Sequence, residues 1–212
     1  MISRELGIVL RKSSLYKNRV WLIAESIGKV EVTIRQPLAI VSRALPGTLV
    51  SIVLEKQHEN WHTDSLMIIA PPIVKTVNDY YWLHHILELY YYFTAPENLD
   101  DNLFKELTNH LSALDNTSIT QEFTGVFNML CVIDFLVRTG FYASPALEHY
   151  QRCFKMIADL NSLEATMNLA THKTLDHLNQ HEQPMLKKVI TACLKSHPQY
   201  ARFNTISFVY PS

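Results

Sequence analysis

The fold is decided by residues 29–35, which read KVEVTIR. Their side chains alternate between polar and aliphatic, the period of a β-strand that buries one face. Four further runs rich in β-branched and aliphatic residues surround this stretch, at residues 6–12, 19–24, 48–54 and 64–69. Residues 25–28 and the pair Pro46-Gly47 supply turn signals between them. Five short strands are too few for a sandwich, so this region predicts a small closed barrel of the OB type.

After Pro72 the spacing of apolar residues changes to that of helices. The first predicted helix covers residues 78–93, with Asn78 or Asp79 as its N-cap. Further helices are predicted at residues 99–114, 119–139, 145–159, 162–180 and 184–196. The helix at 119–139 is apolar on nearly all sides, which predicts a central buried helix with Gly140 as its C-cap. The sequence thus predicts an α+β protein with an N-terminal five-stranded OB-type β-barrel in residues 1–75 and an α-helical domain in residues 76–212.

The two predicted domains differ in charge. Ten basic and six acidic residues give residues 1–75 a net charge of +4, which leaves −5 for residues 76–212 in a chain of net charge −1. A basic β-module joined to a non-basic helical module favours nucleic-acid contact by the first and protein contact by the second.

Seven cations on and around the first three predicted strands are the candidate DNA-binding residues. They are Arg11, Lys12, Lys17, Arg19, Lys29, Arg35 and Arg43. Tyr16 and Trp21 are the aromatic rings nearby that could stack on bases, so binding would be mainly electrostatic, with little sequence specificity. The alternative interpretation is an ordinary solvated surface with no ligand.

Other patterns favour structure over chemistry. The aromatic residues of 80–93 could stack on bases, but on a helix that packs against a barrel they more often build a core. Asp134 lies in an apolar stretch and needs a donor, for which Arg138 is placed four residues later. Three histidines could share a metal, although we interpret them as an exposed helix face because fitting carboxylate or cysteine ligands are missing. These are His172, His177 and His181.

Several function classes lack their usual sequence signals. The chain contains no GxxxxGK[ST], GxGxxG, GxSxG or HExxH motif, so we expect no enzymatic activity and no cofactor. Cys131, Cys153 and Cys193 are spaced neither as a disulfide framework nor as a metal knuckle, and they fit a reducing cytoplasm. We recognise no signal peptide and no membrane span, and therefore expect a cytoplasmic protein.

The order of these patterns resembles the RecO family of bacterial recombination mediators. ELGIVLRKSSLYKNRVWLIAESIGKV, residues 5–30, resembles the opening of that family, and SRALPGTLVSIVLE, residues 42–55, resembles its Ser-Arg segment and the strand that follows. DYYWLHHILELYYYF, residues 79–93, resembles its first long helix. FTGVFNMLCVIDFLVRTGF, residues 123–141, resembles its helix ending in Leu-x-x-x-Gly. The resemblance covers about residues 1–150.

This resemblance implies a non-enzymatic protein that binds single- and double-stranded DNA, anneals complementary strands and helps to load a recombinase onto single-stranded DNA in repair. It also implies a bacterial cytoplasmic or nucleoid location and two partners, a RecR-like protein and the acidic C-terminal tail of the single-strand-binding protein. The tail would need an apolar pocket rimmed by cations, for which Arg138, Arg152 and Lys155 are the candidates. Many members carry a four-cysteine zinc site just after the Leu-x-x-x-Gly helix, but the corresponding residues 141–153 contain only Cys153 and the chain has no CxxC, so we expect no zinc. The alternative function is a protein-interaction adaptor whose OB-like module does not bind nucleic acid.

Overall fold

The computed structural model describes residues 2–13, 16–97, 102–115, 124–141, 150 and 176–210. The chain forms two compact units, Met1–Ala113 and Leu114–Ser212. The boundary expected from the sequence, after residue 75, therefore falls inside the first unit, because the first two long helices belong with the barrel. Among the helices of the described ranges, none has the length and apolar character needed to cross a membrane.

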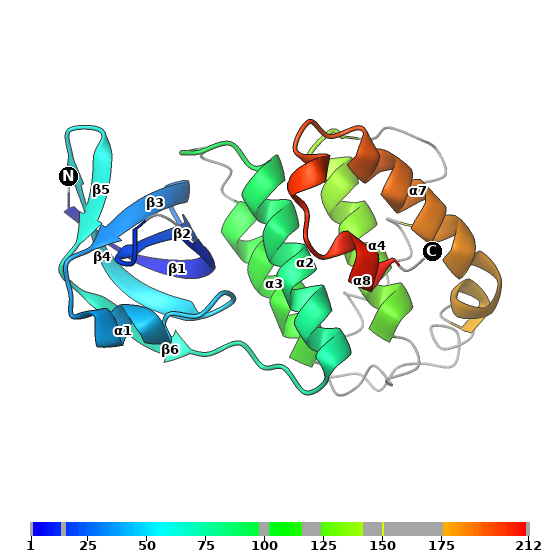
Figure 1. Cartoon of the computed structure of the whole chain (residues 1–212), viewed down its shortest axis with the longest axis horizontal. Coiled ribbons are helices and arrows are strands. Elements are labelled where there is room, and N and C mark those ends of the chain that lie inside the picture. Colours follow the sequence, from blue (N-terminus) through cyan, green and yellow to red (C-terminus); the bar gives the residue numbers. More distant parts are fainter. Residues whose placement is uncertain are drawn as a thin grey trace. The chain divides into compact units, whose positions relative to one another are not determined.

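The first unit begins with a closed five-stranded barrel, drawn in blue to cyan in Figure 1. Its strands are β1 (Ile2–Lys12), β2 (Arg19–Ala24), β3 (Gly28–Ile34), β4 (Leu49–Gln57) and β5 (Asn60–Thr63). They pair in the order β1-β2-β3-β5-β4, and β4 pairs again with β1 to close the ring. All of these pairings are antiparallel except β3 with β5, which is parallel. The α+β class and the small closed barrel predicted from the sequence are confirmed, and the strand order is compatible with an OB-type barrel.

The sequence pattern missed two short elements of this unit. Strand β5 has only four residues, and the run predicted at 64–69 corresponds instead to β6 (Leu66–Ala70), a sixth strand that pairs with β4 outside the ring. The short helix α1 (Leu38–Arg43) follows Pro37, in a stretch where no helix or strand was predicted. Strand β5 and helix α1 are both too short to show a clear period in the sequence.

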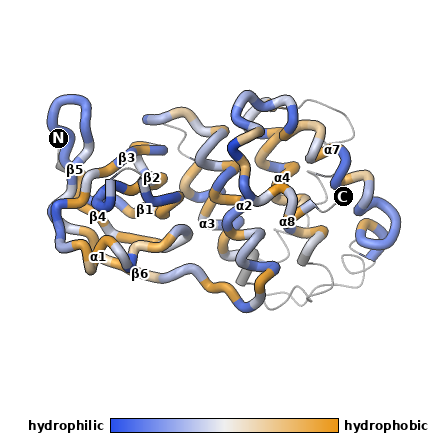
Figure 2. Tube along the Cα trace, viewed as in Figure 1, coloured by the Kyte–Doolittle hydropathy of each residue, from blue (hydrophilic) through white to orange (hydrophobic). Residues whose placement is uncertain are grey.

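Aliphatic side chains at alternating strand positions fill the barrel. On strands β2, β3 and β4 the buried residues of this core include Val20, Leu22, Val30, Val32, Ile34, Val50, Ile52 and Leu54. Trp61 of β5 joins this cluster. Figure 2 shows the hydrophobic residues along the strands and a hydrophilic turn between β4 and β5. The polar residues of the strands therefore face outward, where they are available for binding or for packing against other elements.

Two helices complete the first unit, α2 (Val77–Phe93) and α3 (Leu103–Asp115), which lie beside each other in Figure 1. The N-cap of α2 is Thr76 rather than the predicted Asn78 or Asp79. The Thr76 Oγ1 accepts a hydrogen bond from the Asp79 backbone N–H at 3.1 Å, and the Asp79 carboxylate accepts one from the Thr76 N–H at 2.9 Å. This reciprocal pair is a capping box, so Asp79 contributes at the third helical position instead.

Gly47, in the turn before β4, brings the barrel close to α2. Its φ of +84° is left-handed, a conformation that glycine adopts without strain. A Cβ atom there would lie 3.0 Å from both Leu83 Cδ1 of α2 and Pro72 Cβ. The turn signal at Pro46-Gly47 thus also marks a contact between the barrel and the helix that follows it.

The second unit contains α4 (Thr124–Arg138), the π-helical turn Leu178–Glu182, α7 (Gln183–Lys195), a 3-10 turn Tyr200–Arg202 and the short α8 (Ile206–Val209). Helix α4 is buried from Val126 to Leu136, as predicted for the central helix. Gly140 has φ +72°, and the Phe141 N–H donates to the Leu136 carbonyl at 3.1 Å, which confirms the predicted glycine C-cap. Apart from Tyr150 and residues 176–180, the helices predicted at 145–159 and 162–180 lie outside the described residues.

Candidate nucleic-acid interface

The connection from β1 to β2 places an aromatic ring, Tyr16, beside the guanidinium of Arg19. Tyr16 is 50% exposed, and the Arg19 guanidinium lies 4.2 Å from the centre of its ring. Lys17, between them in sequence, is exposed. The Arg19 N–H donates to the Tyr16 carbonyl at 3.1 Å, and Arg19 Nη1 lies 3.6 Å from a Glu31 carboxylate oxygen on β3. These contacts hold the Arg19 guanidinium against the Tyr16 ring, at a turn where Lys17 is also exposed.

Arg11, a predicted DNA-binding residue, and Trp21, a predicted stacking ring, both contact Tyr91 of α2. The Arg11 guanidinium lies 4.7 Å from the centre of the Tyr91 ring, near the end of α2. Trp21, the cross-strand partner of Arg11, meets the same ring edge-on with 5.5 Å between centroids. Tyr91 thus stands over the outer face of β1 and β2, where it covers part of the surface that an OB-type barrel offers to nucleic acid.

Lys29 is the clearest departure from the sequence prediction. It is only 6% exposed, its ammonium donates to the Tyr91 carbonyl at 2.7 Å, and it lies 5.2 Å from the Tyr91 ring centre and 5.6 Å from that of Trp21. Burial lowers the pKa of this amine from 10.5 to about 8, since desolvation disfavours the charged form. Lys29 was predicted to contact phosphates, but the structure places it between the barrel and α2, and we remove it from the candidate interface.

Lys12 and Arg43 lie at α1. The Lys12 ammonium donates to the carbonyl oxygen of Ser42 at 2.8 Å, and desolvation lowers its pKa. A lysine at the carboxyl end of a helix satisfies a carbonyl that the helix itself leaves unpaired. Arg43, the last residue of α1, is exposed. Lys12 therefore has a structural role beside any contact with phosphate, whereas Arg43 is presented to solvent.

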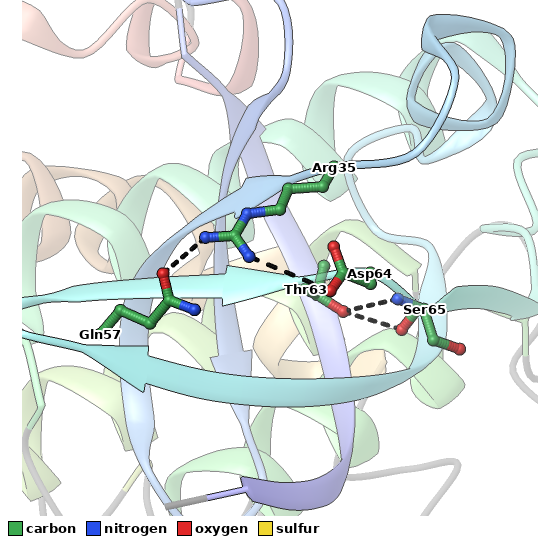
Figure 3. Close-up of polar contacts among 5 residues, drawn as sticks. All are labelled: Arg35, Gln57, Thr63, Asp64 and Ser65. Atoms are coloured by element: carbon green, nitrogen blue, oxygen red, sulfur yellow. Dashed lines mark hydrogen bonds and ion pairs between the residues drawn. The ribbon is translucent and has the colours of Figure 1, made fainter.

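Arg35 lies just after β3, and its side chain reaches across β5 (Figure 3). One guanidinium nitrogen donates to Gln57 Oε1 at 2.6 Å, and another lies 4.0 Å from an Asp64 carboxylate oxygen. Both partners are polar residues at the ends of short connections, and the side chain of Arg35 is 39% exposed. Arg35 is thus available to a phosphate while its head group is already oriented by neighbours.

A segment after α2, which sequence reasoning did not single out, ties the helix to the barrel. The Glu97 N–H donates to the Lys29 carbonyl at 2.8 Å. The Glu97 carboxylate accepts hydrogen bonds from Lys56 at 2.7 Å and from the Trp61 indole at 3.0 Å, and these two bonds lower its pKa. Glu97 adopts a left-handed φ of +51°, which is uncommon for a residue with a side chain. No pattern in the neighbouring sequence predicts this role of Glu97, because its three partners, Lys29, Lys56 and Trp61, all belong to the barrel.

The candidates for partner binding lie in the second unit. Arg138 Nε is 2.8 Å from an Asp134 carboxylate oxygen, which confirms the donor predicted for that buried acid. The Arg138 side chain remains 38% exposed, and Arg152 and Lys155 lie outside the described residues. The rings of His177 and His181 are 5.1 Å apart, and His172 is outside the described residues. Within the described part of the chain, no group of three histidine, cysteine or acidic side chains is arranged to hold a metal ion.

Comparisons of the sequence with protein-family models and with curated proteins gave no significant match. The resemblance to the RecO family therefore stays a prediction from the residues and their order.

Proposed function

We propose that this protein binds DNA through its barrel and acts, without catalytic turnover, as a recombination mediator of the RecO type in DNA repair. The observation that carries the proposal is the cluster of Tyr16, Lys17 and Arg19 at the β1–β2 turn of a closed five-stranded barrel. The loop between the first two strands is one of the elements by which OB-type barrels hold oligonucleotides. An aromatic ring beside cations suits such a ligand, because bases stack on the ring and phosphates attract the charges.

The remaining exposed cations extend this surface. Arg35 and Arg43 add two guanidinium groups near the ends of β3 and α1, whereas Lys29 and Arg11 are engaged with Tyr91. Lys12 is likewise bound to the Ser42 carbonyl. Four of the seven predicted cations then remain as those we propose to contact phosphates, namely Lys17, Arg19, Arg35 and Arg43. With about 0.7 counterions released per phosphate of a single strand, the slope of log Kobs against log salt should be about −3 or smaller in magnitude.

Fluorescence anisotropy of a labelled single-stranded oligonucleotide at several salt concentrations tests this proposal. The double variant Lys17→Gln/Arg19→Gln should bind more weakly and lower the magnitude of the salt slope by about 1.4. The matched control Lys75→Gln/Lys105→Gln removes two positive charges from exposed positions of the same unit. Absence of salt-sensitive binding, or an equal loss in the control, would refute the proposal. Annealing of complementary labelled strands, with and without the protein, then tests the mediator role.

For the second unit we propose the partner contacts that the family resemblance implies, a RecR-like protein and the acidic tail of a single-strand-binding protein. Arg138 supports this as a half-exposed cation on the largely apolar helix α4. Titration of an acidic tail peptide against wild type and Arg138→Ala measures its part. Because Arg138 also pairs with buried Asp134, the unfolding curve of the variant has to be recorded beside the titration. Unchanged peptide affinity in a folded variant would count against the assignment.

One observation favours the second candidate function, a protein-interaction adaptor. Large apolar side chains are exposed along β6, the segment after it and the start of α2. They are Met67, Ile69, Ile73, Val74, Val77 and Tyr80. Exposed apolar residues that follow one another along a surface mark contacts with other proteins more often than with nucleic acid. The salt titration separates the two functions, since contacts through apolar surface are insensitive to moderate salt whereas phosphate contacts are not.

A further inference from the structure

Three aromatic residues belong to the barrel, and they have very different surroundings. Trp61 is in the barrel core with its indole nitrogen bound by Glu97. Trp21 packs against Tyr91 of α2 and has the Lys29 ammonium beside it. Tyr16 alone among these three has half of its surface exposed. A ring that is already packed on protein cannot accept a base, so the position of α2 leaves one barrel residue for stacking.

The neighbours of Tyr16 orient the ring before any ligand binds. The Arg19 guanidinium covers one face at 4.2 Å and is itself positioned by Glu31 across the β2–β3 pair. With that face occupied and half of the residue's surface exposed, a base would stack on the opposite face. A cation on one face also strengthens a sandwich in which a base covers the other, because the guanidinium is planar and itself stacks well. Less conformational freedom is then lost when a base arrives.

Resting on the DNA binding proposed above, we infer that Tyr16 is the stacking platform of this barrel and that the site takes an unpaired base of single-stranded DNA. A base inside a duplex is stacked on its neighbours and presents no free face, so Tyr16 distinguishes single strands from duplexes. The cations do not make this distinction, because both forms carry phosphates. One platform accommodates one base, which gives selectivity for strandedness with little sequence preference.

The experiment compares anisotropy titrations of a single-stranded oligonucleotide and a blunt-ended duplex of two complementary strands with wild type, Tyr16→Ala and Tyr16→Phe. Tyr16→Ala should weaken single-strand binding by about 5- to 150-fold, the loss that corresponds to one base–aromatic stack, and leave duplex binding within about twofold. The salt slope should not change, since stacking releases no counterions. Tyr16→Phe keeps the ring and should restore single-strand affinity. Phe208→Ala, a control on α8 at an aromatic residue that is 56% exposed, should change neither titration.

The outcomes separate this inference from the proposal on which it rests. Wild-type protein that binds neither DNA in a salt-dependent way refutes the proposed function and this inference together. Wild-type protein that binds, combined with a Tyr16→Ala variant that loses both ligands equally or loses neither, overturns the assignment of Tyr16 alone.

Discussion

Replacing Lys29 by methionine tests whether this residue serves the fold or a ligand. The side chain is 6% exposed, and its amine has a pKa of about 8 in the folded protein against 10.5 as the ordinary value. Because the unfolded chain binds this proton more tightly than the folded protein does, the free energy of unfolding rises with pH between about 8 and 10.5. Below pH 8 it stays lower, by a constant amount, than it would be with a neutral amine. At 1.36 kcal/mol per pH unit the full cost of burying the charge is about 3 kcal/mol.

The hydrogen bond to the Tyr91 carbonyl offsets part of this cost, since leaving a buried acceptor unsatisfied costs about 1–3 kcal/mol. Lys29→Met should therefore be close to wild type in stability at pH 7, although it removes a charge. The free energy of unfolding of wild type minus that of the variant should then rise by about 2 kcal/mol from pH 8 to pH 10. Urea denaturation at pH 7, 8, 9 and 10 measures this difference, in which the ionisation of tyrosines common to both proteins cancels.

Lys105→Met changes an exposed lysine of α3 and serves as the matched control, for which the same difference should stay flat. DNA binding by Lys29→Met should equal that of wild type, in contrast to the Lys17→Gln/Arg19→Gln variant. A flat pH profile for Lys29→Met would show that the amine is not buried against α2. A large loss of salt-sensitive DNA binding would restore Lys29 to the interface, and either result would refute the reasoning.

Three further predictions concern the rest of the fold. Gly47→Ala should lower the free energy of unfolding by about 2–4 kcal/mol, because the position has a left-handed φ and the added Cβ would be overpacked against α2. Gly140→Ala also has a left-handed φ, but its added Cβ would meet no atom within 4 Å, so the same denaturation assay should show a loss of only about 1–2 kcal/mol. His85 is fully buried with its pKa lowered to about 3 by desolvation, so the unfolded chain takes up its proton first as the pH falls below 6.5. Stability should drop by about 2 kcal/mol from pH 7 to pH 5, a slope that His85→Leu should lack. Arg138→Met should destabilise the protein by about 1–3 kcal/mol at pH 7, as Asp134 loses a charged donor, and an unchanged unfolding midpoint would contradict that role.

The barrel could be predicted because its information is local. In β3 the polar and aliphatic side chains alternate residue by residue, and every second residue of β2 and β4 also lies in the barrel core. Strand β5 was missed because it has four residues and is defined by its partners, for example Lys56 opposite Trp61 and Val32 beside Trp61. Such pairings join segments far apart in the chain, and a window moved along the sequence does not register them.

The interface was predicted less well, because counting cations says nothing of what covers them. Arg11 and Lys29 are engaged by Tyr91, and Lys29 and Tyr91 are 62 residues apart. A count of charges along the sequence does not distinguish these two residues from Lys17, which is exposed. The aromatic residues of 80–93, which were interpreted as core-forming, do bury Trp82 and Tyr90, and Tyr91 adds the contact with the barrel.

A signal for the covered face was nevertheless present in the sequence of β2. Its residues RVWLIA do not alternate, since Trp21 and Ile23 face away from the barrel core formed by Val20 and Leu22. A strand with apolar residues on both faces has both faces covered, as parallel strands buried on two sides also show. In the β2–β3 pair Ile23 stands opposite Lys29, and Ile23 is fully buried. Lys29 therefore lies on the covered face, beside Ile23. Arg19 stands opposite Thr33, at the end of the pair where polar residues occupy this face. The pairing of β2 with β3 therefore indicates that Arg19 lies at the open end of this face, whereas Lys29 lies at the end that α2 covers.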